Sequence, residues 1–546
     1  MVAAVKVDTQ RVGALPVIAE FCNRLQLADI VNTHVPWAGE VPLGDIVEIL
    51  VANRLLEPKP MYKVGSWATK ATLANYYKIA EEKLHDDCIG RALERLADHG
   101  EQVQAALVLR AIDRFGLKVN QVHYDMSTIE LYGAYENYNE VGVTDPPIPR
   151  PAYGHTKSGR KHLKQIQFGI NVVKDGAVPI SHRVFDGNTP EAPTHLQNLK
   201  DLARLLPKGD LLYLGDSKLD SQENLLAIVA GQGKFVGGGT FSEAMQNLYL
   251  SVRDRLEPLD YHPQSQTKLL PEQRDQYQGV EVRQELRGLV DGRTLCCKYR
   301  LLFIWSEAKA RQEATTRQRH VDKISVVFTQ TVKNLNKYKL TTKEAVVRRL
   351  EVARGRYAEG QLFHYEIGEA LKGQLTLTWR IDSRALTQWE VLEGVFLLKT
   401  NLLVKTHSLV EVLRTYKGQI QVERRIGNLK GPLAVTPMFL KNPKRMAGLL
   451  YILVWALMIL SLMERQVRQQ LKGKPMYGLY PEKRPSKAPT GVRLIEAFEY
   501  LCIVLLHEQG ETTRYLGELD ATQRQILTLL DMAPGQMKTF KCRCGT

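Results

Sequence analysis

The segment Tyr416-Lys-Gly-Gln-Ile-Gln-Val-Glu423-Arg-Arg-Ile-Gly-Asn-Leu-Lys430 places a single carboxylate among several cations. Its pattern favours a helix, and a helix would put Tyr416, Glu423 and Lys430 two turns apart on one side. Taken alone, these charges are typical of a solvated helix face with ion pairs between neighbouring turns. The alternative is that the three side chains meet one ligand. The rest of the chain decides between the two.

The length and the net charge limit the classes of protein to which the chain can belong. With 546 residues the chain is too long for one hydrophobic core, so we expect several domains, one of them interrupted by an insertion. The formal net charge of +15 favours a polyanion as partner, because Lys and Arg that neutralise phosphates release condensed counterions. Nucleic acid is the favoured partner, and an anionic membrane surface is the alternative.

The cysteines and the N-terminus indicate a reducing compartment. The seven cysteines form no paired framework, and Cys542-Arg-Cys544 has no second Cys or His pair near it, so we assign no zinc. The first residues lack the charged start and apolar core of a signal peptide. We therefore expect a cytoplasmic protein that associates with the nucleoid when it is bound to DNA.

One segment tests this expectation of a soluble protein. Residues Met446 to Met463 carry no charge and approach the length of a membrane span. A helix that is apolar all round is either a core element or a span. The segment stands alone, has basic residues on both sides and follows the Glu423 segment closely enough to pack under it. We expect a buried core helix and no membrane partner.

Helical periodicity dominates residues 1–116. Apolar residues follow one stripe from Leu15 to Leu25 and another from Ile46 to Val51, and Asp86-Asp87 begins a third helix. The region is predicted to be a small all-helical domain. It is either a helix-turn-helix module that binds terminal-repeat DNA or an ordinary helical domain with charged faces.

From residue 117 the pattern changes to that of a sheet with helices. One strand ends at Asp125, two strand-like runs follow at 164–173 and 178–185, and a later strand delivers Gly215-Asp216. The two acids would come together if their strands are neighbours in the sheet. Residues 117–236 are therefore predicted to be the first part of an α/β core.

Residues 237–390 are predicted to form an insertion in which short strands alternate with basic helices. The expected strands are 295–304, 324–329 and 375–380. The cations of the helices form either a solvated face or a surface that follows phosphates. These cations are Arg311, Arg317, Arg319, Lys323, Lys333, Lys337, Lys339, Lys343, Arg348, Arg349, Arg354 and Arg356.

The core is expected to resume over residues 391–474, with a strand at 395–399, the Glu423 helix and the apolar helix. Residues 475–546 are predicted to be a linker rich in Pro, Lys and Gly, followed by a helical region. The apolar stripe of that region is Leu494, Phe498, Leu501 and Leu505.

Asp125, Asp216 and Glu423 together suggest a chemistry. Three carboxylates that crowd together repel one another unless cations neutralise them, and hard divalent metals prefer such oxygen ligands. Two Mg²⁺ ions can activate a water or a 3′-hydroxyl and stabilise the leaving oxygen of a phosphoryl transfer. Acids at strand ends are nevertheless common, so spacing alone does not establish a metal site.

The chain resembles the DDE transposases of bacterial insertion sequences, in the branch with a Tyr-x-x-Arg-x-x-x-Glu-x₆-Lys signature. Tyr416, Glu423 and Lys430 fit that spacing, and Gln419 stands where the signature has Arg. Arg424 or Arg425 could supply the missing phosphate contact. The other motifs are Tyr124-Asp125-Met-Ser-Thr128, Tyr153-Gly-His-Thr-Lys-Ser158-Gly-Arg160 with Asn188-Thr189, and Gly215-Asp216-Ser-Lys.

The resemblance implies a ribonuclease H-like core, a mixed sheet flanked by helices, interrupted by a β-rich insertion. It implies that Asp125, Asp216 and Glu423 bind two catalytic metal ions, Mg²⁺ with Mn²⁺ as the alternative. Tyr416 and Lys430 would contact phosphates of the transposon end. Trp379 or Trp389 would stack on a displaced base, although each is more often a core residue. His123 and His155 are expected to be hydrogen-bonded core histidines.

The expected function is therefore a cut-and-paste DNA transposase. It would bind the terminal inverted repeats as a homodimer, cleave the phosphodiester at each transposon end and join the 3′-hydroxyls to target DNA. One alternative is a catalytically silent DNA-binding protein derived from such an enzyme. A second alternative is a membrane protein anchored by residues 446–463.

Overall fold

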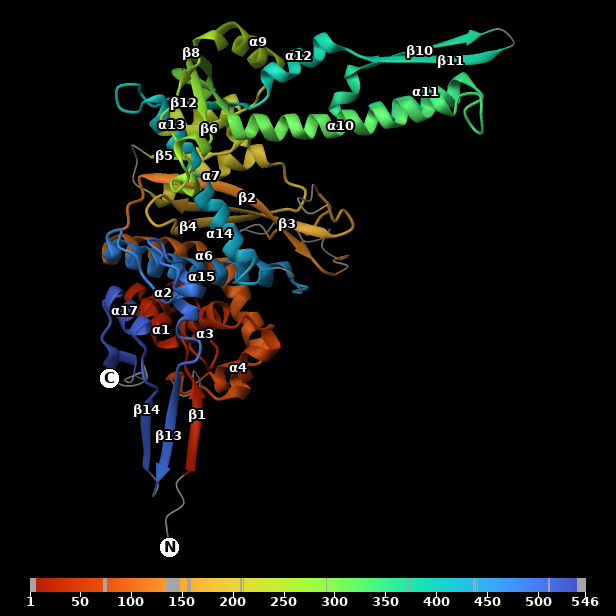
Figure 1. The fold of residues 1–546 in the computed structure, drawn as a ribbon. Coiled ribbons are helices and arrows are strands. Elements are labelled where there is room, and N and C mark those ends of the chain that lie inside the picture. Colours follow the sequence, from red (N-terminus) through yellow and green to blue (C-terminus); the bar gives the residue numbers. More distant parts are fainter. Residues whose placement is uncertain are drawn as a thin grey trace. The chain divides into compact units, whose positions relative to one another are not determined.

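The computed structural model describes residues 6–71, 76–133, 135, 148–154, 159–206, 209, 211–290, 292–370, 373–435, 438, 440–508 and 511–537. The fold is mixed α/β, with a large mixed sheet flanked by helices (Figure 1). The chain divides into two compact units. The first unit contains Met1–Phe235 and Lys417–Thr546, and the second contains Val236–Tyr416.

Four strands of the first unit lie in the order β4-β3-β2-β5. Strands β2, β3 and β4 are antiparallel neighbours, whereas β5 runs parallel to β2. Nearly every residue of β2 and β3 is buried, which is expected of strands covered on both faces. The bounds are β2 Gln121–Leu131, β3 Lys164–Val173, β4 Pro179–Phe185 and β5 Leu212–Gly215. The first strand was predicted to end at Asp125, but β2 continues for six residues beyond it.

Helices cover both faces of these strands. Helix α7 (Glu191–Leu205) lies on one face, where the Tyr124 hydroxyl donates to Thr194 Oγ1 at 3.2 Å. Helices α14 (Ile420–Lys430) and α15 (Pro443–Leu471) lie on the other face, where Tyr451 of α15 contacts the His182 ring of β4 at 4.5 Å. Helix α8 (Gln222–Ala230) packs beside α7.

Helix α15 contains the long apolar segment. Its most apolar 18-residue window has a mean hydropathy of 2.3, and 89% of that window is buried inside the protein. It packs along α6 (Asp86–Phe115), where Trp455 Nε1 donates to Gln104 Oε1 at 2.9 Å. The prediction of a buried core helix is confirmed, and a core helix is consistent with a soluble protein.

The N-terminal region is helical after its first strand. Strand β1 (Lys6–Arg11) pairs antiparallel with β13 (Cys502–Glu508), which pairs with β14 (Glu511–Leu516). The prediction of a continuous helical C-terminal region is therefore wrong over residues 502–516. The strand pairing joins residues about 490 positions apart, which local periodicity cannot reveal. The helices of these regions are α1 Leu15–Leu25, α2 Leu27–His34, α3 Leu43–Leu56, α4 Val64–Lys70, α16 Gly491–Glu496 and α17 Ala521–Leu529.

The second unit contains five strands in the order β6-β12-β9-β8-β7 and a separate hairpin of β10 and β11. The strands are β6 Lys234–Gly239, which begins in the first unit, β7 Glu257–Pro258, β8 Tyr277–Val290, β9 Arg293–Ser306, β10 Phe363–Ala370, β11 Gln374–Ile381 and β12 Val395–Thr400. The helices are α9 Glu243–Val252, α10 Glu307–Lys333, α11 Lys343–Arg354, α12 Ser383–Leu392 and α13 Leu409–Lys417. This unit continues to Tyr416, beyond the predicted end of the insertion at residue 390.

The predicted strand at 324–329 is wrong, because these residues lie inside the 27-residue helix α10. The buried residues Val321, Ile324 and Phe328 of α10 follow a helical spacing and face the β10–β11 hairpin. A short β-branched run gave the strand prediction, and the surrounding helix overrides that local preference.

Candidate active site

Asp125 lies in β2, and Asp216 directly follows β5, the strand that is parallel and adjacent to β2. The last matched pair of these strands is His123 with Leu214, and each aspartate comes two residues later in the chain, Asp125 within β2 and Asp216 just past the end of β5 at Gly215. Neighbouring strands are about 4.8 Å apart, and side chains two residues apart point to the same face. The two strands are neighbours, which is the condition that the sequence analysis set for the two acids to meet, and both aspartates follow the last matched pair at the same end of these strands.

Local hydrogen bonds position both carboxylates. Asp125 is half-buried, and its Oδ1 accepts from the Met126 amide at 2.8 Å. Asp216 begins the 3₁₀ helix Ser217–Leu219, and its Oδ1 accepts from the Lys218 amide at 2.9 Å. Asp is a favoured N-cap residue because its short side chain reaches the unpaired amides of the first turn. This cap holds Asp216 at the end of β5.

The start of α14 lies over β2 next to Asp125. His123 and Gln419 are both buried, and a hydrogen bond of 3.2 Å joins His123 Nδ1 to Gln419 Oε1. Gln419 Nε2 donates to the Tyr124 carbonyl oxygen at 2.7 Å. Since side chains alternate along a strand, His123 and Asp125 both face α14. Gln419, which stands at the signature's Arg position, thus anchors α14 to the strand that carries Asp125.

His123 is a neutral core histidine, as predicted. Burial lowers its pKa to about 4, so the ring carries no charge at neutral pH. A proton on Nδ1 satisfies both of its hydrogen bonds, because Nε2 then accepts from the Gln121 amide group at 3.2 Å. The His123 ring therefore helps to hold the start of α14 against β2, and it places no positive charge beside Asp125.

The predicted single helix from Tyr416 to Lys430 is wrong. Helix α13 ends at Lys417, and α14 begins at Ile420 after a turn at Gly418 and Gln419. Glycine weakens a helix interior because it loses the most backbone freedom on folding. Tyr416 also belongs to the second unit, so helical spacing does not relate it to Glu423. Glu423 and Lys430 do share α14 and lie two turns apart.

Glu423 is exposed on the surface of α14, which packs on β2 and β3. Lys430 is half-buried at the end of the same helix, and Arg424 is exposed. Among the described residues, no three or more His, Cys, Asp and Glu side chains are gathered closely enough to hold a metal ion. The fold therefore sets Asp125 and Asp216 at the same end of two neighbouring strands, and the described residues contain no preformed group of these two acids with Glu423. The oxygen donors of the two aspartates fit a hard divalent cation.

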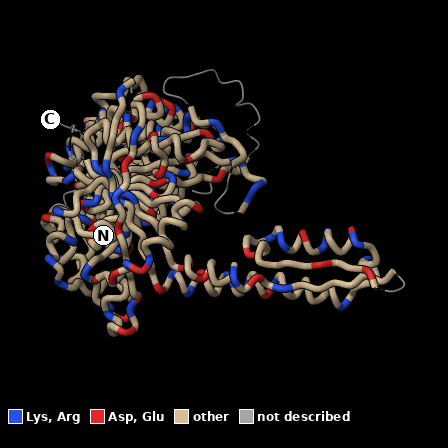
Figure 2. Tube along the Cα trace, turned by 90° about the horizontal axis from the view of Figure 1, so that it is seen from above, with Lys and Arg blue, Asp and Glu red and all other residues tan. Residues whose placement is uncertain are grey.

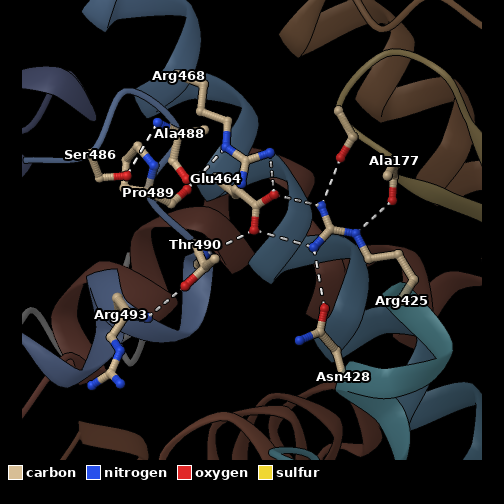
Figure 3. Close-up of polar contacts among 12 residues, drawn as sticks. Ala177, Arg425, Asn428, Glu464, Arg468, Ser486, Ala488, Pro489, Thr490 and Arg493 are labelled. Carbon is tan, nitrogen blue, oxygen red and sulfur yellow. Dashed lines mark hydrogen bonds and ion pairs between the residues drawn. The ribbon is translucent and has the colours of Figure 1, made fainter. Parts of the chain in front are cut away.

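Arg425 is a buried link in the core of the first unit (Figure 3). Its guanidinium donates to both carboxylate oxygens of Glu464, at 3.1 and 3.3 Å. It also donates to the carbonyl oxygens of Gly176 and Ala177, at 2.8 and 3.0 Å. These bonds tie α14 to α15 and to the β3–β4 turn. Because the guanidinium is enclosed and fully engaged, we do not assign the predicted phosphate contact to it.

Glu464 is the buried ion-pair partner of Arg425 that sequence reasoning missed. It forms a second ion pair with Arg468 at 2.7 Å and accepts from the Gly491 amide at 2.9 Å. It is the single acid in the 29 residues of α15. A lone carboxylate in an apolar helix requires a buried partner, so this signal was present in the sequence.

Trp379 and Trp389 pack against the hydrophobic core between α10, α11 and the β10–β11 hairpin. The Trp379 ring lies 5.5 Å from Phe328 and stacks on Phe363 at 5.8 Å. These contacts give both tryptophans a packing role, which is the commoner role of a large aromatic ring. We do not assign a base contact to either. His155, Cys542 and Cys544 lie outside the described residues.

Comparison with known proteins gives a limited result. Residues 7–108 match a domain of unknown function, DUF4277. This stretch runs from β1 into α6, within the first unit. No curated protein matches the chain.

Proposed function

We propose that the chain is a metal-dependent DNA transposase of the DDE type. The observation that carries the proposal is the register of β2 and β5, which sets Asp125 and Asp216 level beneath the helix that bears Glu423. The mixed sheet with helices on both faces supports a ribonuclease H-like core, and the second unit supports an insertion into that core. The basic net charge supports DNA as the partner.

In this proposal Asp125, Asp216 and Glu423 would hold two divalent metal ions, Mg²⁺ or Mn²⁺. The ions would supply Lewis-acid activation of the attacking oxygen and charge stabilisation on the leaving oxygen. Gln419 and His123 keep α14 against β2, so the chain sets how near Glu423 comes to the two aspartates. The cations of Arg424 and Lys430 lie on the same helix and are suited to phosphate.

The remaining parts of the proposal follow the resemblance. Tyr416 contacts the transposon end, and the helical N-terminal region that includes residues 7–108 recognises the terminal repeats. A homodimer in the bacterial cytoplasm holds two ends together, cleaves them and joins the 3′-hydroxyls to target DNA.

The test is cleavage of linear DNA that carries the sequences flanking this reading frame, in the presence of Mg²⁺. We expect D125N, D216N and E423Q to lower cleavage by roughly 10³-fold, because each removes a metal ligand. Asp254 of the second unit is exposed, and D254N removes the same charge and should retain wild-type cleavage. Wild-type cleavage by all three site variants, with unfolding temperatures unchanged, would refute the assignment.

One observation favours a second candidate, a transposase-derived protein that binds DNA without cutting it. Glu423 is exposed and no three-acid group is gathered among the described residues. This candidate predicts tight and specific binding of the end DNA with no cleavage by the wild type in either Mg²⁺ or Mn²⁺. Metal-dependent cleavage that D125N abolishes would exclude it.

A further inference from the structure

A groove of about 500 Å³ lies between α10 and α11 of the second unit. Its cationic lining consists of Lys323 from α10, Arg348 and Arg349 from α11, and Arg356 just after α11. No Asp or Glu lines it. The cations recur along these two helices, in the part of the second unit that extends to the right in Figure 2.

The four groove cations differ from most other cations of these helices in how their charge is balanced. All four side chains are exposed, and none of them forms an ion pair with a carboxylate in the part of the chain that the structure describes. In contrast, Arg317 pairs with Glu393 at 2.6 Å and Arg354 pairs with Glu351 at 2.7 Å. Clustered like charges raise the local potential unless an anion neutralises them.

An aromatic and aliphatic strip lies among these cations. The Tyr357 ring stacks on His320 at 4.1 Å, and the charged ends of Lys323 and Arg356 lie 5.9 and 5.7 Å from its centre. Val352 also lines the groove and is 70% exposed. Such a lining is suited to a chain in which anionic groups alternate with apolar rings, as phosphates alternate with deoxyribose.

The groove has a rigid support. The buried residues Ile324 and Ala353 line it and also belong to the hydrophobic core that joins α10 and α11 to the β10–β11 hairpin. Arg348 and Arg349 lie on one turn of α11 and Val352 lies on the next, so the helix fixes their spacing. The helix and the hydrophobic core therefore hold these cations in place without the help of a bound ligand.

We propose that the α10–α11 groove binds the sugar–phosphate backbone of double-stranded DNA, independently of base sequence. The proposal rests on the proposed function for the identity of the polyanion. DNA is favoured over an acidic protein because the chain carries a net charge of +15, and because further cations lie at the facing ends of the two helices, Lys333 and Lys343, and in the connection between them, Lys337 and Lys339. A long polyanion can engage this whole series, whereas a single anion occupies only one part of it.

The experiment measures the affinity of the full-length protein for a short fluorescent duplex of random sequence over a range of salt concentrations. We expect R348Q/R349Q to weaken binding and to reduce the slope of log K against log salt by about 2, because about one counterion is released for each phosphate contact. R348K/R349K should recover most of the affinity, since the positive charges remain.

The matched control is R253Q/R255Q, which removes the same net charge from exposed positions of the second unit that belong neither to the groove lining nor to the cations beyond it. It should lose clearly less affinity than R348Q/R349Q. Equal losses in the two double variants would show that only total charge matters and would overturn the proposal. Unchanged DNA affinity and slope in R348Q/R349Q would also overturn it and would leave an acidic protein as the occupant.

The results that would refute DNA binding by the groove differ from the results that would refute the proposed function. A wild-type protein that binds duplex DNA through the groove and never cleaves end DNA would refute the enzyme and retain the groove. A protein that cleaves end DNA while R348Q/R349Q binds normally would retain the enzyme and refute the groove.

Discussion

At the scale of single residues, the two adjacent arginines of α14 have opposite environments. Arg425 is 4% exposed and forms the ion pair with Glu464, whose side chain is 7% exposed. Arg424 is exposed and, among the described residues, has no ion pair or hydrogen bond assigned to it. Sequence alone treated them as equivalent candidates for phosphate contact. The difference arises from the 100° rotation between successive helix residues, which turns one toward the core and the other toward solvent.

This contrast gives a stability prediction. Arg425→Gln should lower the free energy of unfolding of the first unit by about 3–5 kcal/mol, because it leaves Glu464 buried with an incomplete set of partners. Arg424→Gln removes the same charge one residue away and should change it by less than about 0.5 kcal/mol. Thermal and urea unfolding followed by circular dichroism measure both. Equal small effects would show that the Arg425 network contributes little to stability.

At the scale of elements, the close approach of α6 and α15 depends on glycine. A Cβ at Gly448 of α15 would overlap the Leu93 carbonyl oxygen of α6. A backbone atom cannot rotate away as a side chain can, so the two helices would have to separate. The α13–α14 break depends on glycine in a different way, since Gly418 ends one helix before the next begins.

Gly448→Ala is therefore expected to lower the free energy of unfolding by about 1–3 kcal/mol, the usual cost of overpacking. Gly427→Ala on α14 is its control, because a Cβ there meets no atom within 4 Å. That control should raise stability by about 0.5–1 kcal/mol, since alanine loses less backbone freedom in a helix. The comparison is made by the unfolding midpoint in urea. A neutral Gly448→Ala variant would contradict the tight α6–α15 contact.

At the scale of the whole molecule, the first unit buries titratable groups that set its response to acid. Burial lowers the pKa of His123 and of His195 from 6.5 to about 4, and that of His182 to about 3. Between these values the unfolded chain binds protons that the folded chain does not, so stability falls as the pH falls below about 6.5. Each histidine contributes about 2 kcal/mol of this loss at pH 5, from 1.36 kcal/mol per unit of pKa.

His195→Gln should remove about a third of this acid sensitivity. The glutamine can still bond to the Tyr213 hydroxyl, which lies 3.0 Å from His195 Nδ1, but it does not titrate. Denaturant unfolding of the wild type and the variant at pH 7 and pH 5 gives the two differences. The exposed His162→Gln variant should lose as much stability as the wild type between these pH values. If His195→Gln did the same, the acid response would come from other groups.

The sequence by itself determined the features that rest on local pattern and composition. The apolar run of residues 446–463 was enough to predict a buried helix, because 18 uncharged residues cannot face water. Two strands were also predicted from periodicity and turn signals: the strand at 164–173 and the strand directly before Asp216, which ends at Gly215.

Only the tertiary structure decided the features that rest on long-range pairing. The parallel register of β2 and β5 sets Asp125 level with Asp216, and no pattern within either strand encodes that register. The pairing of β1 with β13 overrode a helical stripe, and the packing of α14 turned Arg425 inward and Gln419 onto β2. The physical reason is the same in each case. Burial against a partner distant in sequence outweighs the weak local preference of a short segment.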